Sequence, residues 1–199
     1  MNMKKLVITG GPCAGKTTVL AALREEFGTT LVYVPEAATM LLDSGFPAPG
    51  PDLEWSRAWQ EALQSAVLPL QRSLESAYTL VARQTKASLM VCDRGVLDGA
   101  AYIEGGLEEF CQRFRVEFGA ELHRYSAVIH LESLAVIEPE RYGKTGNRNR
   151  FESMEEAQQL DARTRAAWAK HQRHILVGGK RGIEGKIAEV IGVVKALVQ

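Results

Sequence analysis

Short apolar runs recur along the chain, separated by longer stretches that alternate apolar and polar residues. The runs are Leu6 to Thr9, Leu31 to Val34, Ser88 to Cys92, Ala127 to Leu131 and His174 to Val177. Runs of this length are typical of strands buried on both faces, and the helical stretches between them indicate a parallel sheet covered by helices on both sides. We therefore predict an α/β fold that binds its ligand where the strands end.

The longest interruption between two runs is an insertion at about residues 46–87. The proline-rich segment Phe46 to Pro51 cannot be helical, because each proline also restricts the residue before it. We expect Asp52 to cap a helix that carries Trp55 and Trp59 at i, i+4 spacing. A second helix is expected from about Gln71 to Lys86. The tryptophan stripe is either a ligand platform or, more commonly for such stripes, part of the core.

Two further helices follow from the pattern near the end of the chain. Ser153-Met154-Glu155-Glu156 reads as a capping box that opens a helix reaching about Lys170. The last helix carries an apolar stripe from Ile183 to Leu197 that we expect to pack on the sheet. No linker divides the 199 residues, so we expect a single domain over residues 1–199.

The balance of charge excludes some classes of partner. The chain carries 24 basic and 24 acidic side chains, so its formal net charge is zero and nothing global attracts nucleic acid or an anionic membrane. No segment approaches the ~20 apolar residues needed to cross a bilayer. The three cysteines are an odd number without metal-binding spacing. We therefore expect a cytoplasmic protein without a nucleic-acid partner.

The most specific motif lies between the first apolar run and the helical stretch that follows it. Gly10-Gly11-Pro12-Cys13-Ala14-Gly15-Lys16-Thr17 matches the P-loop pattern G-x-x-x-x-G-K-S/T in its strand–loop–helix context. Such a loop wraps backbone N–H groups around a polyphosphate and points a helix N-terminus at it. Lys16 would bind the β- and γ-phosphates of ATP, and the hydroxyl of Thr17 would bind Mg²⁺. The predicted nucleotide-binding residues are Gly10, Gly11, Pro12, Cys13, Ala14, Gly15, Lys16, Thr17 and Thr18.

A carboxylate follows the second run. Glu36, in Val34-Pro35-Glu36-Ala37, is placed to accept a proton from an attacking hydroxyl beside the phosphate loop. It can equally serve the start of the next helix, where an acidic side chain is favourable. The sequence leaves both roles open.

An acidic and a basic residue follow the third run. Asp93 ends that strand, where P-loop proteins hold the carboxylate that orients Mg²⁺. Arg94 next to it supplies a fork of donors for a phosphate. Asp98 can bind a substrate hydroxyl, act as the base in place of Glu36, or cap the next helix.

A basic loop, about residues 138–152, follows the fourth run. Its arginines, Arg148 and Arg150 among them, suit a lid that closes over phosphates and neutralises the charge of phosphoryl transfer. A solvated basic loop is the alternative.

The glycine loop, the segment ending in Glu36, the Asp93-Arg94-Gly95 segment and the arginine-rich loop together resemble P-loop nucleoside and nucleotide kinases. The likeness is strongest to the kinase domain of nicotinamide riboside kinase/adenylyltransferase proteins and to the related small AAA-type ATP-binding domains. This resemblance implies a P-loop NTPase fold of three layers, with a five-stranded parallel sheet of order 2-3-1-4-5 and a lid.

The resemblance to deoxynucleoside kinases also implies roles for single residues. It gives Glu36 the role of general base, Asp93 and Arg94 that of the acid–arginine pair, and Arg148 and Arg150 that of lid arginines. The chain departs from these kinases at Gly95, where they usually have serine, and after Glu36, where they have proline.

The motifs predict a kinase that transfers the γ-phosphoryl group of ATP·Mg²⁺ to a hydroxyl of a nucleoside-like or other polar metabolite. A second hypothesis is a nucleotide-dependent binding module for ATP or GTP with protein or phosphoinositide partners. The N-K-x-D guanine signature is absent after the fourth run, where Glu132-Ser133-Leu134 stands. A third hypothesis, an ATPase coupled to a partner, ranks last.

Overall fold

The computed structural model describes residues 3–142, 153–179 and 181–199. Five parallel strands form one sheet in the order β2-β3-β1-β4-β5. The strands are β1 (Lys5–Thr9), β2 (Leu31–Val34), β3 (Leu89–Asp93), β4 (Ala127–Leu131) and β5 (His174–Val177). The predicted α/β class, the five strands and their order are confirmed.

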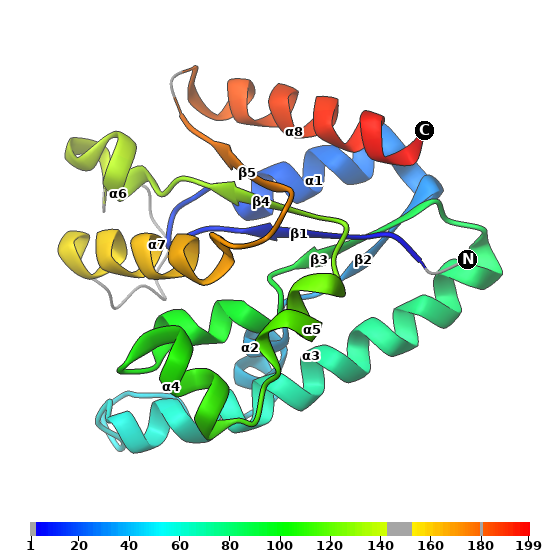
Figure 1. Ribbon diagram of the computed structural model, residues 1–199. Coiled ribbons are helices and arrows are strands. Elements are labelled where there is room, and N and C mark those ends of the chain that lie inside the picture. Colours follow the sequence, from blue (N-terminus) through cyan, green and yellow to red (C-terminus); the bar gives the residue numbers. More distant parts are fainter. Residues whose placement is uncertain (1–2, 143–152, 180) are drawn as a thin grey trace.

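Helices cover both faces of the sheet (Figure 1). The helices are α1 (Lys16–Phe27), α2 (Ala37–Asp43), α3 (Arg57–Thr85), α4 (Gly106–Arg113), α5 (Phe118–His123), α6 (Leu134–Ile137), α7 (Met154–Trp168) and α8 (Gly182–Val198), with short 3₁₀ segments η1 (Gly28–Thr30), η2 (Val96–Tyr102) and η3 (Pro139–Arg141). The predicted capping box is present at the start of α7, where Ser153 and Glu156 bond each other's backbone N–H.

The alternation of side chains along each strand divides the core into two layers. In β1, Leu6 and Ile8 face the layer filled by α1 and α8, while Val7 faces the layer filled by α3, η2, α4 and α7. All three of these side chains are fully buried. Because helices bury both faces of the sheet, each strand is a continuous apolar run, which explains why the strands could be predicted from the sequence.

The insertion contains one long helix, which corrects the prediction of two. Helix α3 runs without a break through Pro69, and its buried side chains continue from Leu63 to Ala82. Packing of this buried face stabilises one continuous helix. The expectation that a second helix begins at about Gln71 is therefore wrong. The cap is also wrong: Ser56, and not Asp52, is the N-cap, and its Oγ accepts from the N–H of Trp59 at 3.2 Å. Asp52 lies in the turn that joins Gly50 to Leu53.

Candidate active site

The phosphate loop occupies the carboxyl end of β1, in the middle of the sheet. Gly10 has a φ of 141°, and a Cβ on it would lie 2.1 Å from the carbonyl oxygen of Leu131, so no other residue fits. Gly15 has a φ of 89° and precedes the first turn of α1, which contains Lys16, Thr17 and Thr18. The loop thus bends back on itself and leads directly into a helix N-terminus, as an anion site requires.

Lys16 lies folded over this loop. Its Nζ donates to the carbonyl oxygens of Gly10 at 3.2 Å and Gly11 at 3.3 Å. Burial, helped by the positive charge of Arg94, lowers the pKa of Lys16 to about 8. An ammonium group held by two neutral carbonyls is well prepared to turn toward phosphate oxygens, since a phosphate is the stronger acceptor.

Two side chains that the motif does not include fasten the first half of the loop from outside. Asp161 of α7 is buried, and its Oδ1 accepts from the N–H of Gly11 at 2.9 Å. The same oxygen accepts from the N–H of Ser133 at 3.0 Å, and Ser133 Oγ donates to the carbonyl oxygen of Pro12. The loop is therefore tied to α7 and to the end of β4.

A second lysine fastens the other half of the loop. Lys186, in α8, is only 4 % exposed, and its Nζ donates to the carbonyl oxygen of Ala14 at 3.0 Å and to that of Glu132 at 2.6 Å. The apolar stripe of α8 predicted core packing, and nothing in the sequence distinguished Lys186 or Asp161. Both come from helices remote in sequence from the motif and belong to no pattern of their own.

Glu36 and Arg94 meet beside the phosphate loop, from the ends of the neighbouring strands β2 and β3. The Nε of Arg94 donates to Oε1 of Glu36, and its Nη1 donates to the carbonyl oxygen of Gly10 at 3.3 Å. The other oxygen of Glu36 accepts from the hydroxyl of Thr39 at 2.8 Å. Glu36 occupies the N-cap position of α2, but its side chain bonds none of that helix's N–H groups. Its carboxylate therefore links Arg94 to the hydroxyl of Thr39 in the first turn of α2.

Charge around Glu36 keeps it ionised. Burial alone would raise its pKa, but the positive charges of Arg94 and Lys16 outweigh burial and lower the pKa of Glu36 to about 2.

Arg94 has a φ of 66°, a left-handed backbone that is uncommon for a side chain of this size. Strained residues of this kind cluster at functional sites.

Asp93 has the free oxygen that a metal ligand needs. Its Oδ1 is buried and has no hydrogen-bond partner in the described part of the chain. Burial, together with the negative charge of Glu36, raises the pKa of Asp93 to about 6. Among the described residues, no three acidic, histidine or cysteine side chains cluster as a metal cage. One carboxylate and the hydroxyl of Thr17 fit Mg²⁺ that is held mainly by phosphates and water.

Asp98 does not cap the next helix, which corrects one of the three roles considered for it. It lies inside η2, whose N-cap is Gly95, so it caps no helix. It is 2 % exposed, and its carboxylate accepts from Thr9 Oγ1 at 2.6 Å, Arg94 Nη1 at 3.2 Å and Trp168 Nε1 at 2.6 Å. With both oxygens occupied by the protein, Asp98 is a poor candidate for a proton acceptor.

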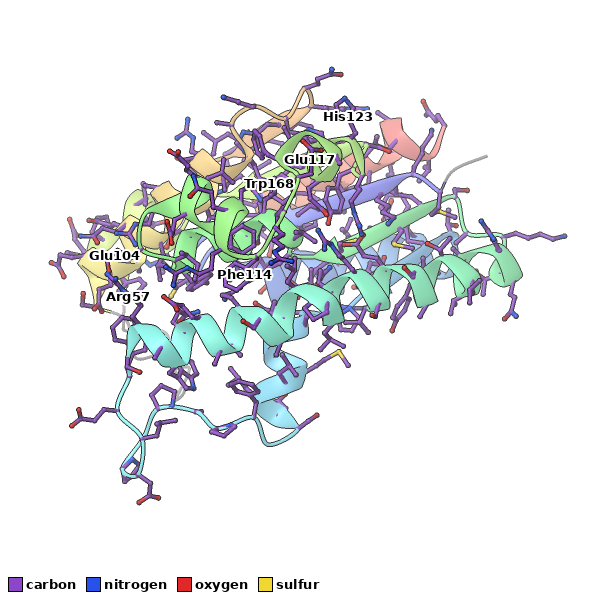
Figure 2. The ribbon with its side chains drawn as sticks, turned by 60° about the horizontal axis from the view of Figure 1, so that its bottom comes forward. Arg57, Glu104, Phe114, Glu117, His123 and Trp168 are labelled. Atoms are coloured by element: carbon purple, nitrogen blue, oxygen red, sulfur yellow. The ribbon has the colours of Figure 1, made fainter. Side chains whose placement is uncertain are left out.

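A cavity of about 870 Å³ extends from Glu36 and Arg94 along α3. Trp55 and Trp59 line it, which corrects the prediction that they belong to the core: Trp55 is 64 % exposed and Trp59 is half-buried. Trp59 Nε1 donates to the carbonyl oxygen of Pro47 at 2.6 Å and so holds the proline segment against α3. Arg57, the first residue of α3, pairs with Glu104, and the two lie together at that end of the helix (Figure 2).

Two buried amides also line this cavity. Gln60 is 7 % and Gln64 is 5 % exposed, and both side chains line the cavity. A Cβ on Gly99 would lie only 2.6 Å from Oε1 of Gln64, so the glycine makes room for this amide. An amide carries two N–H donors and an acceptor oxygen, so these two side chains can hydrogen-bond a polar molecule in the cavity. Their spacing of four residues on α3 is the signal that sequence reasoning missed.

A separate cavity of about 680 Å³ lies at the ends of β4 and β5, on the opposite side of the phosphate loop. Its lining includes Glu132, Glu138, Gly178, Gly179 and Arg181. Arg148 and Arg150, the predicted lid arginines, lie outside the described residues. The described part of the predicted lid segment, residues 138–142, contains η3 and the caps on either side of it, and Arg141 pairs with Glu138 at 2.6 Å.

The family of the chain follows from the match of its sequence to the model of a known protein family. The model of the AAA domain family matches residues 5–185, which is most of the chain. The chain belongs to the AAA domain family. No curated protein matches the sequence of this AAA domain. A solved structure of deoxyadenosine kinase from M. mycoides with bound dATP matches the fold with a TM-score of 0.55 and 14 % identity, over 96 % of this chain and 99 % of that one.

These comparisons confirm the predicted AAA domain and the predicted P-loop kinase fold. The finer likeness to nicotinamide riboside kinases stays a prediction. Among the described residues of this AAA domain, no helix is both long and apolar enough to span a bilayer.

Proposed function

We propose that the protein is a kinase that transfers the γ-phosphoryl group of ATP to a hydroxyl of a nucleoside-like or other polar metabolite. The observation that carries the proposal is the Glu36–Arg94 pair, which lies between the phosphate loop and the cavity lined by Trp59 and the amides of Gln60 and Gln64. A carboxylate and a guanidinium at that junction can serve the two reactants of a phosphoryl transfer, the acceptor hydroxyl and the phosphate.

The phosphate side of the reaction falls to the loop. Its N–H groups and Lys16 would hold the β- and γ-phosphates, and Thr17 and Asp93 would hold Mg²⁺. When bound, Mg²⁺ neutralises charge that accumulates on the phosphate oxygens. Arg94 would stabilise the transferring group, and the resemblance adds Arg148 and Arg150 to that task.

The acceptor side falls to Glu36. Its carboxylate is 24 % exposed and borders the cavity, so it can reach a bound hydroxyl, whereas Asp98 has no free oxygen. A carboxylate with a pKa of about 2 is a weak base. Glu36 therefore has to exchange its bond to Arg94 for a bond to the acceptor, and Arg94 in turn becomes free for the phosphate. This exchange raises the basicity of Glu36 only when both substrates are present.

The lining of the larger cavity favours an acceptor without a phosphate group. Among the described residues that line it, the charged side chains are the carboxylates Glu36, Glu54, Asp98 and Glu156 and the guanidinium groups of Arg94 and Arg163. Acidic groups are in excess, and Arg94 is already paired with two of them. An anionic acceptor would meet repulsion here, while a neutral nucleoside-like compound could stack on Trp59 and bond the amides of Gln60 and Gln64.

The smaller cavity is placed to receive the base of the phosphoryl donor. It borders Glu132 and the glycines that follow β5, on the side of the loop away from Glu36. Donor and acceptor would then approach Lys16 from opposite sides, which is the in-line arrangement that phosphoryl transfer needs.

The proposal is tested by measuring ADP release from ATP·Mg²⁺ alone and with a panel of nucleosides, nucleoside monophosphates, sugars and phosphoinositide head groups. Lys16→Ala, checked for an unchanged circular dichroism spectrum, serves as the blank. Stimulation by nucleosides or another neutral class supports the kinase. Tight nucleotide binding without stimulation by any class would contradict it and favour a nucleotide-dependent binding module.

A further inference from the structure

Arg94 is held by two carboxylates that differ in their freedom to move. Glu36 is bound by Arg94 and by the hydroxyl of Thr39, and its side chain borders the cavity. Asp98 is enclosed by Thr9, Arg94 and Trp168. If Glu36 leaves Arg94 for an acceptor hydroxyl, Asp98 is the partner that stays in place.

Trp168 fixes the direction of Asp98. It is the last residue of α7 and is fully buried. Its ring lies against Gly95, where a Cβ would be 2.8 Å from Cζ2 of Trp168 and 3.0 Å from a methyl group of Val7. The rings of Tyr125 and Trp168 pack in a T-shaped arrangement, and their centroids are 5.4 Å apart. With the indole confined on these sides, its Nε1–H can point only along a fixed line toward Oδ1 of Asp98.

Thr9 ties the same carboxylate to the phosphate loop. It is the last residue of β1 and immediately precedes Gly10, whose carbonyl oxygen accepts from Arg94 Nη1 at 3.3 Å. Oδ2 of Asp98 therefore bonds both the start of the loop and the guanidinium group. This shared oxygen sets the position of Arg94 relative to the phosphates.

We propose that Asp98 and Trp168 are positioning residues that hold Arg94 against the phosphate loop while Glu36 engages the acceptor. The inference rests on the proposed function, since the exchange of Glu36 between Arg94 and a hydroxyl is part of it. In this proposal Asp98 and Trp168 act on the reaction through Arg94, to which Asp98 bonds directly and Trp168 through Asp98. Their task is to keep Arg94 aligned after it loses one of its two carboxylates.

The variants that test this are Asp98→Asn, which keeps the shape of the side chain, and Trp168→Phe, which keeps the aromatic packing and removes the N–H. Tyr125→Phe is the matched control: Tyr125 touches the same indole, but its hydroxyl donates to the buried Glu75 and not to Asp98. We expect kcat to fall roughly 10- to 100-fold in the two test variants, because small misplacements of a catalytic group are costly. The Kd of ATP should stay within about threefold, since the loop is intact.

The control should lose thermal stability and keep kcat within about twofold of the wild type. If kcat in all three variants simply follows the loss of Tm, or does not change, the two residues are structural and the proposal fails. A second readout does not depend on turnover. In protein labelled with ¹⁵N-arginine, the Nε–H signal of Arg94, assigned with Arg94→Lys, should be sharp in the wild type and Tyr125→Phe and shifted or broadened in Asp98→Asn.

The two proposals can fail separately. If no acceptor is found, the kinase is refuted, while the Arg94 signal still decides whether Asp98 orients the guanidinium. An unchanged signal in Asp98→Asn would overturn the positioning role even in an active kinase.

Discussion

The carboxylate of Glu36 accepts a hydrogen bond from Nε of Arg94, although the two residues are 58 positions apart in the chain. They meet because β2 and β3 are neighbours in the sheet and each residue follows the carboxyl end of its strand. The pair separates the phosphate loop from the larger cavity, so its rearrangement would couple the two sites.

Replacing Glu36 by glutamine should abolish the acceptance of a proton and keep the size of the side chain. We expect Glu36→Gln to lower transfer by roughly 10²- to 10⁴-fold, which is the usual contribution of a positioned base. The Kd of ATP should change little, because the loop amides and Lys16 are untouched. Single-turnover kinetics and equilibrium binding measure the two quantities, and transfer at the wild-type rate would place the base elsewhere.

Asp93→Asn should stabilise the protein in the absence of nucleotide at neutral pH. The pKa of Asp93 is about 6 in the folded protein and 3.8 for an ordinary aspartate, so the folded state binds more protons between these values and its stability falls as pH rises through them. Above pH 6 the full penalty, roughly 2 to 3 kcal/mol, is present. Urea titrations should show a gain for Asp93→Asn at pH 7.5 that shrinks toward pH 4.5. A gain that is equal at both pH values would show that the charge is not its cause.

The same variant should lose Mg²⁺-dependent turnover, because an amide cannot supply the carboxylate charge to the metal. Turnover is measured as ADP release at increasing Mg²⁺. Asp52→Asn is a matched control, since Asp52 is an exposed aspartate in the turn before α3. Wild-type Mg²⁺ dependence in Asp93→Asn would exclude Asp93 as a ligand.

ATP binding should be accompanied by proton uptake at alkaline pH. The pKa of Lys16 is about 8 in the free protein, so at pH 9 most molecules carry a neutral amine. Phosphate oxygens favour the ammonium form, and we expect uptake of about one proton per ATP at pH 9 and much less at pH 7. Calorimetry in two buffers with different ionisation enthalpies measures the uptake. Lys16→Arg, which stays charged, should show none, and equal uptake in this variant would assign the proton to another group.

Gly95→Ser, which installs the residue usual in deoxynucleoside kinases, should destabilise this protein. A Cβ at this position would lie 2.8 Å from the ring of Trp168, and the buried indole cannot move away. Overpacking of this kind typically costs 1–3 kcal/mol, so we expect a loss of about 2 kcal/mol in urea unfolding. Gly192→Ser is the control, because the space around Gly192 is open. Wild-type stability in Gly95→Ser would show that Trp168 can yield.

The strands and the residues at their ends could be predicted because local sequence determines them. Buried strands are unbroken apolar runs, and Glu36, Asp93 and Arg94 come directly after such runs. The phosphate loop is a local motif as well, so its bend required no knowledge of the rest of the chain.

The remaining features depend on contacts between distant segments. Asp161 and Lys186 touch the loop across 150 and 172 positions, and no local pattern marks them. Helix α3 continues through Pro69 because tertiary packing overrides the local preference. Trp55 and Trp59 have the spacing of a core stripe, yet they border a cavity, because only the fold determines what lies opposite a helix face.

The fastening of the phosphate loop by Asp161 and Lys186 has a consequence for biosynthesis. Residues 10–17 leave the ribosome well before Asp161 and Lys186, the two residues whose side chains hold the loop, because these lie 150 and 172 positions after their partners in the loop. A nascent chain that ends before Asp161 contains the complete motif but lacks the partner of the Gly11 N–H. The loop can therefore gain both anchors only after Lys186 has been synthesised, so a premature stop codon before Asp161 would remove them although the motif itself is translated.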